Sequence, residues 1–384
     1  MSISPLSCDV AIVGGGIVGC SAALALRKLG KSVILIERDL CGSRSSGVNY
    51  GGVRRQGRSV IQLPLAQRAH AIWEKLPEIL GSSCEYTRSG HLKIARSDAD
   101  LASLIAYQEK AEPFGLGLQI YSGHQLRELY PWLSERVVGG SLCAEDGHAN
   151  PRLVSPAFAR AASQAGAQLM ERTQVIDMAH SNAGFTLQTS TGQVIKAPVL
   201  LNCAGAWASF VAEKFNETVP MISAHPTMAV TEPLPNFMSL SLGVEGGGIY
   251  ARQAHRGNCV IGGSRGFALD ELRARPSREA IQLVLARSVE LLPQLKHANI
   301  IRTWSGTEGY LPDHEPVIGP SRTTPGLFHG FGFAGAGFQI GPAVGEVLSE
   351  LATQGQTTTP LDGFSISRFS RVLSSITTTL GDLP

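Results

Sequence analysis

The sequence predicts an α/β protein with two domains: a Rossmann-like domain and a second, α+β domain built on a mainly antiparallel β-sheet. Three observations predict this fold. Residues 9–37 read as a strand, a helix and a second strand with very short connections, and such a unit places its strands in parallel. Residues 220–320 are rich in strands. From about residue 325 the chain returns to a strand, a glycine loop and a helix.

The first unit of this fold lies near the N-terminus. The apolar run DVAIVGG at 9–15 predicts a short buried strand, IVGCSAALALRKLG at 17–30 has helical spacing, and KSVILIE at 31–37 predicts a second buried strand. Short apolar runs without alternation are typical of strands that are covered on both faces. The two strands should therefore be neighbours in one parallel sheet.

A G-x-G-x-x-G pattern, formed by Gly14, Gly16 and Gly19, joins the first strand to the helix. Gly14 permits the tight turn, Gly16 lets a pyrophosphate approach the backbone, and Gly19 lets the helix pack closely on the strand. Glu37 ends the second strand, where its carboxylate can accept hydrogen bonds from ribose hydroxyls. These features predict a dinucleotide site; the alternative is an α/β crossover whose glycines serve only packing.

The loop that follows helps to choose between NAD and FAD, which both use this pattern. Its sequence, RDLCGSRSSGVNYGGVRRQG at 38–57, is long and polar, whereas an NAD-dependent dehydrogenase would normally continue with regular βα units. The hydroxyls of Ser45 and Ser46 suit a second phosphate and a ribityl chain. The loop therefore favours FAD, with a solvated surface loop as the alternative.

Two segments in the middle of the chain also predict where a helix begins and where a strand ends. Asn150-Pro151 predicts an N-cap followed by proline in the first turn of a helix that ends at Gly166. VLLNCAGAWA at 199–208 predicts a buried strand that runs into Ala-Gly-Ala. Small residues there would let the backbone pass against a cofactor, although an ordinary strand-to-helix turn would look the same.

A third glycine-rich segment, GFGFAGAGFQIGP, lies at 330–342. It follows the apolar run GLFHGF and precedes AVGEVLSELA, a pattern that predicts a helix beginning near Pro342. Glycine tolerates positive φ and lets the backbone approach other groups closely. The arrangement should therefore aim backbone N–H groups at one point, where they would stabilise negative charge.

Charge, cysteine spacing and hydropathy narrow the possible functions. A net charge of +2 over 384 residues gives no electrostatic case for nucleic acid as a partner. None of the seven cysteines has a C-x-x-C spacing, so no metal site is expected. No stretch of 18 or more apolar residues predicts a membrane span, and the N-terminus lacks the basic region of a signal peptide. We expect a cytoplasmic protein, with peripheral membrane association through a partner as the alternative.

Together these motifs resemble the FAD-dependent D-amino-acid-oxidase-like superfamily, which includes glycine oxidase and sarcosine oxidase. The resemblance rests on the glycine pattern, Glu37, Ser45-Ser46, NCAGAW, and PDHEPVIGP followed by GLFHGFGFAGAGFQIGP, in the family's order over nearly the whole chain. It implies FAD as the cofactor, with the last glycine loop beside the flavin ring. The cofactor-binding residues that it implies are Gly14, Gly16, Ile17, Val18, Gly19, Glu37, Arg38, Ser45, Ser46, Asn49, Gly51, Gly52, Val175, Ala204, Gly205, Trp207, Gly335, Ala336, Gly337, Phe338 and Gln339.

The stretch WSGTEGYLPDHEPVIG at 304–319 separates branches of this superfamily. Glycine oxidase-like members tend to carry an arginine here that binds the substrate carboxylate, whereas this chain has Thr307-Glu308. This stretch and GGVRRQG look more like the flavin (beta) subunits of heteromeric proline, hydroxyproline and opine dehydrogenases, and of hydrogen cyanide synthase. The resemblance therefore implies a secondary amine as substrate, such as D-hydroxyproline, proline or an opine.

Three residues are candidates for contact with that substrate. Tyr250 and Arg252 lie two apart in one predicted strand, so they share a face. The family often has an aromatic residue at the place of Tyr250. Arg252 could bind a carboxylate bidentately or be a surface arginine, and Glu308 could bind the substrate ammonium or pair with an arginine.

The resemblance predicts hydride transfer from the amino acid to flavin, giving an imine. We expect the chain to be the catalytic subunit of a heteromeric dehydrogenase whose partner carries a second redox centre, because no cysteine spacing suits a cluster and no second nucleotide fold is present. The alternatives are a single-chain glycine, sarcosine or D-amino-acid oxidase that uses oxygen, and a flavin-bearing electron-relay or structural subunit. The expected division is an FAD-binding domain at 1–83, 151–220 and 321–365, a substrate domain at 84–150 and 221–320, and a tail at 366–384.

Overall fold

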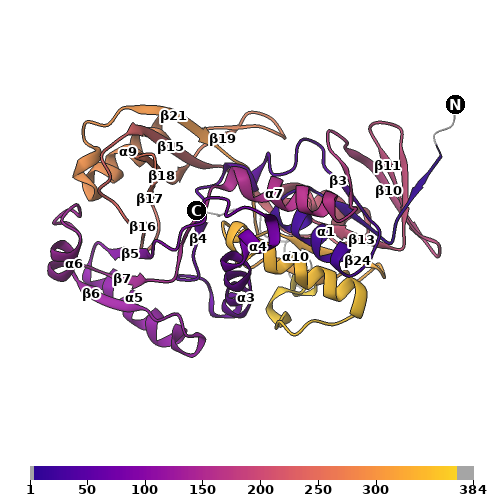
Figure 1. Ribbon diagram of the computed structural model, residues 1–384, viewed down its shortest axis with the longest axis horizontal. Coiled ribbons are helices and arrows are strands. Elements are labelled where there is room, and N and C mark those ends of the chain that lie inside the picture. The colour runs from indigo at the N-terminus through magenta and orange to yellow at the C-terminus, as the bar shows by residue number, and fades with distance from the viewer. Residues whose placement is uncertain (1–3, 370–384) are drawn as a thin grey trace, which may run out of the picture.

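The computed structural model describes residues 4–369. The predicted tail therefore lies outside the described residues from 370 onward. Figure 1 shows two sheets side by side along the long axis of the molecule, one with most of the helices and one with α9 (Arg278–Leu291) on its outer side. The predicted α/β fold with a second, mainly antiparallel sheet is confirmed.

The first sheet has six strands, and it is parallel except where its edge strand β23 (Val317–Pro320) pairs with β24 (Leu327–Phe331). The predicted βαβ unit forms its centre, where β2 pairs with β3 in parallel and α1 connects them. In sheet order the strands are β23 (Val317–Pro320), β24 (Leu327–Phe331), β13 (Val199–Asn202), β2 (Val10–Val13), β3 (Val33–Ile36) and β9 (Gln168–Met170).

The two faces of this sheet bury different cores because successive strand residues point to opposite sides. Val10 and Ile12 pack among the helices, whereas Ala11 packs toward a four-stranded sheet. The helices on this part of the molecule are α1 (Ile17–Lys28), α3 (Leu63–Glu74), α4 (Leu76–Leu80), α7 (Pro151–Gln164), α8 (Ala208–Lys214) and α10 (Gly337–Gln354). The four-stranded sheet contains β1 (Leu6–Ser7), β12 (Val194–Ala197), β11 (Gly184–Thr189) and β10 (Val175–Ser181).

The sequence predicted the start of one of these helices correctly and the start of another wrongly. Helix α7 begins as predicted, since the Asn150 side chain accepts a hydrogen bond from the Arg152 N–H and Pro151 lies in the first turn. The prediction that the last helix begins at Pro342 was wrong, because α10 begins at Gly337 and contains Pro342. A proline there lacks the N–H that would bond to the carbonyl of Phe338, and its ring crowds that carbonyl, but the helix continues through it to Gln354.

The second sheet has eight strands and is antiparallel except where β16 pairs with β5. Its outer face packs against α9 through a core that includes Leu92, Leu242 and Ala251, and its inner face is therefore left for other contacts. In sheet order the strands are β21 (Ile300–Ser305), β15 (Pro226–Pro233), β18 (Asn258–Arg265), β17 (Tyr250–Gln253), β16 (Ser241–Val244), β5 (His91–Ala95), β7 (Gly139–Cys143) and β6 (Gln119–Ser122).

The remaining elements connect or cover the two sheets. Three short strand pairs are β4 (Gly52–Val53) with β8 (Gly147–His148), β14 (Ile222–Ala224) with β22 (Glu308–Tyr310), and β19 (Phe267–Ala268) with β20 (Ala274–Arg275). The other helices are α2 (Ser45–Val48), α5 (Asp98–Ala111), α6 (Gly123–Leu129) and α9 (Arg278–Leu291). None of the helices within residues 4–369 combines the length and the apolar character that a membrane crossing requires.

Candidate active site

One cavity of about 1030 Å³ is lined by residues of both large sheets, at the upper end of the range for small-molecule and cofactor sites. We call its two sides the glycine wall and the sheet wall. The glycine wall contains Gly14, Gly15, Gly16, Ile17, Val18, Glu37, Ser45, Ser46, Gly335, Gly337 and Phe338. The sheet wall contains Arg54, Arg58, His91, Lys93, Met228, Gly243 and Tyr250.

The turn between β2 and α1 can only be built from glycine. Gly14 has a φ of +108°, and a Cβ atom on it would lie 2.3 Å from the carbonyl oxygen of Cys203. A Cβ atom on Gly19 would lie 2.0 Å from the carbonyl oxygen of Gly14. Gly19 therefore fixes the close packing of helix on strand and does not itself line the cavity, whereas Gly14, Gly16, Ile17 and Val18 do. The N-terminus of α1 opens directly into the cavity.

Glu37 is held in place at the end of β3. Its carboxylate accepts hydrogen bonds from the backbone N–H of Gly15 at 2.7 Å and of Asp39 at 2.8 Å. These bonds fix the carboxylate beside the glycine turn, with the side chain lining the cavity. A fixed acceptor at this place suits ribose hydroxyls next to a pyrophosphate on the helix N-terminus.

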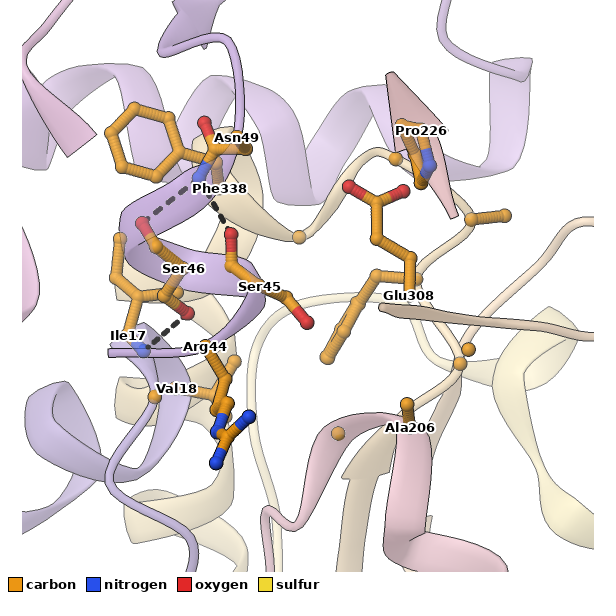
Figure 2. Close-up of a pocket in the computed structure, with 18 of the residues that line it drawn as sticks. Ile17, Val18, Arg44, Ser45, Ser46, Asn49, Ala206, Pro226, Glu308 and Phe338 are labelled. Carbon is orange, nitrogen blue, oxygen red and sulfur yellow. Dashed lines mark hydrogen bonds between the residues drawn. The ribbon is translucent and has the colours of Figure 1, made fainter. Parts of the chain in front are cut away.

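The polar loop after β3 folds over the start of α1. The Ser46 hydroxyl oxygen accepts a hydrogen bond from the Ile17 N–H at 3.0 Å, so it lies at the helix N-terminus. Asn49 donates to the carbonyl oxygens of Ser45 and Ser46 and thereby closes the short helix α2. Figure 2 shows these bonds and draws α2 and Glu308 on opposite sides of the open space. The loop is part of the cavity and not a solvated surface segment.

A further stretch of the cavity lies beyond Glu37. It is lined by Arg38, Val175, Ala204, Gly205 and Trp207, all predicted. The Arg38 guanidinium lies over the Trp207 ring, 4.4 Å from its centroid, and the Trp207 indole N–H donates to the carbonyl oxygen of Glu271 at 2.9 Å. The small residues after β13 leave room beside this stacked pair.

The C-terminal glycine loop borders the cavity, and the helix that follows it, α10, packs on α1. Gly332 and Gly335 have φ values of +77° and +81°, and these turns bring the N-terminus of α10 to the cavity. Gly337 and Phe338 line it, so a second helix N-terminus, with its unpaired N–H groups, faces the same space. A Cβ atom on Gly335 would lie 3.8 Å from a carboxylate oxygen of Glu308.

Glu308 itself lies where the two walls meet, and it lines the cavity. It is held by β22, and the Tyr310 hydroxyl donates to its carboxylate at 3.2 Å. Burial raises the pKa of Glu308 above 4.5, while the hydrogen bond from Tyr310 opposes that rise. Glu308 is therefore a carboxyl group that could accept a proton or a hydrogen bond from a bound amine.

Tyr250 is positioned on the sheet wall by the strand opposite it. It pairs with Gly262 of β18, and a Cβ atom on Gly262 would lie 2.4 Å from the Tyr250 ring. The ring also packs against Tyr50, with centroids 4.8 Å apart. Burial raises the pKa of the Tyr250 phenol well above its ordinary value, so the phenol stays protonated and can donate a hydrogen bond.

Arg252 shares a strand face with Tyr250 but does not line the cavity. Its Nε donates to the carbonyl oxygen of Tyr50 at 2.9 Å, and its guanidinium lies 5.6 Å from the centroid of the Tyr50 ring. Tyr50 is the residue that faces the cavity there. Arg252 thus supports Tyr50, and the structure gives it no direct place beside a substrate.

Three other predicted residues lie outside the cavity lining. A Cβ atom on Gly51 would lie 2.2 Å from the carbonyl oxygen of Ala149, so this glycine serves packing. Gln339 is fully buried and fastens α10 to α3, because its side chain donates to the carbonyl of Ala66 and its own carbonyl accepts from the Trp73 indole. Ala336 is the N-cap of α10. Gly52, by contrast, does line the cavity.

Sequence reasoning missed the basic residues of the sheet wall. His91 and Lys93 alternate with Leu92 and Ile94 in β5, and this period of two could have placed both polar residues on one inner face. Arg54 and Arg58 offered no such signal, because they lie in an irregular loop. Burial, with the positive charges of Arg54 and Lys93, holds the pKa of His91 well below 6.5, so His91 is neutral.

A helix N-terminus in a glycine turn, a fixed carboxylate at the end of β3 and a cavity of about 1030 Å³ define a dinucleotide-binding protein. The comparisons with known proteins name the family: residues 9–351 match the family described as FAD dependent oxidoreductase. The chain belongs to this family, and the expected cofactor, FAD, is confirmed. The glycine cradle, Glu37 and the two helix N-termini are residues that fit FAD.

Two relatives and two solved structures illustrate the similarity. The chain is 26% identical to human mitochondrial sarcosine dehydrogenase, covering 96% of this chain but only 42% of that protein. It is 27% identical to one of the subunits of opine oxidase from Rhizobium meliloti, covering 83% of this chain and 87% of that one. The structure of L-proline dehydrogenase from P. horikoshii matches with a TM-score of 0.89 at 28% identity, covering 96% and 99% of the two chains. Glycine oxidase from Geobacillus kaustophilus matches with a TM-score of 0.88 at 25% identity, covering 94% and 99%.

Proposed function

We propose that this chain oxidises a secondary amino acid, such as sarcosine, proline, D-hydroxyproline or an opine, at its CH–NH bond. The observation that carries the proposal is that the cofactor cradle, Tyr250, Glu308 and two arginines line a single cavity. Names of relatives that contain sarcosine, opine and proline support this substrate class.

The residues of the chain supply binding and orientation for this reaction. FAD, when bound, accepts a hydride from the carbon next to nitrogen, and the resulting imine can be hydrolysed by water. The protonated Tyr250 phenol offers a hydrogen bond to a substrate carboxylate, and the guanidinium groups of Arg54 and Arg58 offer charge to it. Glu308 offers an acceptor for the substrate amine. We assign the carboxylate to these residues in place of Arg252, because Arg252 does not line the cavity.

A simple experiment tests this function. The purified yellow protein is mixed anaerobically with sarcosine, L-proline, D-hydroxyproline, an opine and lactate, and flavin absorbance is followed. Bleaching by one of the amines but not by lactate is expected. Bleaching by lactate alone would refute the amine assignment, and a flavin that no amine reduces would favour an electron-relay subunit.

We also propose that the chain acts as one subunit of a heteromeric dehydrogenase. Its similarity to proteins that are named as subunits of opine oxidase and of sarcosine oxidase supports this assembly. A single-chain oxidase is the second candidate, supported by the match over nearly the full length of glycine oxidase. Steady-state turnover of the isolated chain with oxygen, and then with an artificial dye, distinguishes them. Fast peroxide production without a partner would favour the oxidase.

A further inference from the structure

The sheet wall carries two guanidinium groups that the protein itself does not neutralise. Arg58 is 7% exposed, and within residues 4–369 its side chain forms no hydrogen bond or ion pair; its Nε is buried without an acceptor. Arg54 is half-buried, and within the same residues its side chain donates only to the carbonyl oxygen of Gln56, which carries no net charge. A buried charge without a partner is costly, so natural proteins usually pair it. Arg58 is therefore a buried charge that requires an anion from beyond the described residues, and the half-buried Arg54 offers a second guanidinium group to the same anion.

The nearby acids are already engaged. Asp146 accepts hydrogen bonds from the backbone N–H groups of Arg55 and Gln56 and from the Arg55 guanidinium. Glu315 accepts from the Gln62 side chain at 2.7 Å, and Glu245 pairs with Lys93. Burial, and then the charge of Arg54, lower the pKa of Arg58 to about 9. Because this pKa still lies above neutral pH, the Arg58 guanidinium stays protonated and positively charged.

This cationic pair is separate from the phosphate cradle. A Cβ atom on Gly57 would lie 3.2 Å from the Lys93 ammonium and 3.3 Å from a guanidinium nitrogen of Arg54. The pair thus lies beside β5 of the eight-stranded sheet, whereas the helix N-terminus and Ser46 belong to the glycine wall. The diphosphate of FAD belongs to that cradle, so the anion beside Arg54 and Arg58 belongs to the substrate.

We propose that Arg54 and Arg58 form a subsite for a dicarboxylic secondary amine, that is, an amino acid whose nitrogen carries a carboxyalkyl group. The inference deepens the proposed function and rests on it. One carboxylate would leave one of the two guanidinium groups uncompensated, whereas two carboxylates match both charges, each able to bind a guanidinium fork. The neutral His91 and the paired Lys93 add no further charge to this count.

The test uses two ligands that cannot be oxidised as amines and that differ by one carboxylate. Oxydiacetate is the ether analogue of iminodiacetate, and methoxyacetate is the ether analogue of sarcosine. Each is titrated into the FAD-loaded protein while the flavin absorbance spectrum is recorded. We expect the Kd of oxydiacetate to be at least tenfold lower than that of methoxyacetate. Equal Kd values would overturn the proposal.

Three variants locate the effect. In R58Q and in R54Q the ratio of the two Kd values should fall below threefold. R136Q removes an exposed arginine that does not line the cavity, so it should keep the ratio of the unmodified protein. An unchanged ratio in R58Q would place the anion elsewhere and overturn the assignment.

Thermal unfolding separates a binding role from a structural one. R58Q removes an unpaired buried charge, so without ligand it should unfold at the same or a higher temperature than the unmodified protein. Oxydiacetate should raise the unfolding temperature of the unmodified protein much more than that of R58Q. A clear loss of stability in R58Q without ligand would make Arg58 a structural residue and overturn the proposal.

The proposed function can fail separately from this subsite. One assay tests both the amine oxidation and the dicarboxylate subsite: anaerobic flavin reduction by iminodiacetate is compared with reduction by sarcosine. Reduction by sarcosine and proline with no preference for iminodiacetate would overturn the dicarboxylate subsite and leave the amine oxidation intact. A tight, Arg58-dependent oxydiacetate complex in a protein that no amine reduces would support the anion subsite and refute the proposed function.

Discussion

The glycine wall and the sheet wall of the cavity recognise ligands with different parts of the chain. The glycine wall works through backbone N–H groups, which glycines and two helix N-termini direct into the cavity. The sheet wall works through side chains, Tyr250, Arg54 and Arg58 among them, which strands and loops bring to one face. Backbone recognition leaves little freedom in sequence, whereas side-chain recognition can change with each residue. The comparison shows that the backbone of the fold determines the cofactor site, whereas the side chains carried by the sheet and its loops determine the substrate site.

The largest expected effect is on the glycine wall, from Gly14→Ala. The new methyl group would lie 2.3 Å from the Cys203 carbonyl oxygen at a φ of +108°, so the turn must move and the cradle is lost. We expect almost no FAD to remain after gel filtration, measured by absorbance at the flavin band. Gly30→Ala is the matched control, because Gly30 has a φ of +78° but no atom within 4 Å of its Cβ position. Full FAD content in Gly14→Ala would contradict the backbone account.

The next largest effect concerns the loop that carries Arg54 and Arg58. Asp146 is 0% exposed and pairs with Arg55 at 3.1 Å. Asp146→Ala leaves a buried arginine unpaired, which should lower the free energy of unfolding by about 3–5 kcal/mol. Chemical denaturation measures this loss. Asp270→Ala, which removes the exposed pair with Arg273, should change stability little. A similarly small loss in Asp146→Ala would mean that this loop is not held by its ion pair.

A smaller effect is expected from Glu37→Ala on the glycine wall. The carboxylate is the one side-chain acceptor of that turn with a predicted role toward ribose, and it holds the Gly15 and Asp39 N–H groups. Its removal should weaken FAD binding by about 1–3 kcal/mol, the range for a hydrogen bond to a charged partner. Fluorescence titration of the apoprotein with FAD measures the change. An unchanged Kd would leave Glu37 with a role in the turn alone.

The same contrast explains how much the sequence could predict. Gly14, Gly16, Glu37 and Ser46 line the cavity as expected, because the signal for them is local: a short strand, a turn that needs glycine and a helix start. Arg54 and Arg58 could not be placed in this way, because their neighbours come from β5 and from the loop at residue 146. Pro342 misled for another reason, since proline permits a helix start without requiring one.

A contact between two distant segments of the chain could also not be predicted from the sequence. Tyr250 and Arg252 share a face as the alternation predicted, yet only Tyr250 lines the cavity. The difference depends on Tyr50, whose ring packs on Tyr250 and whose carbonyl accepts from Arg252. Tyr50 belongs to a loop that is 200 residues away from Tyr250 along the chain, by difference of their numbers. No local pattern in either segment contains that contact.

The smallest expected effect concerns Glu308, where the two walls meet. Burial raises the folded-state pKa of Glu308 above the ordinary 4.5, so between these two values the folded protein holds a proton that the unfolded chain has released. The contribution of this carboxyl group to stability is therefore fully present below pH 4.5 and is lost as pH rises through the folded-state pKa. Glu308→Gln keeps the size and cannot titrate. Relative to this variant, the unmodified holoprotein should lose stability as pH rises from 4 to 8, measured by thermal unfolding at each pH.

Tyr310→Phe removes the hydrogen bond that holds the pKa of Glu308 down, so the loss of stability should extend to higher pH. Parallel pH profiles for all three proteins would show that Glu308 titrates as an ordinary solvated carboxylate, and the cavity would then be wetter at this meeting point than the burial of its walls implies.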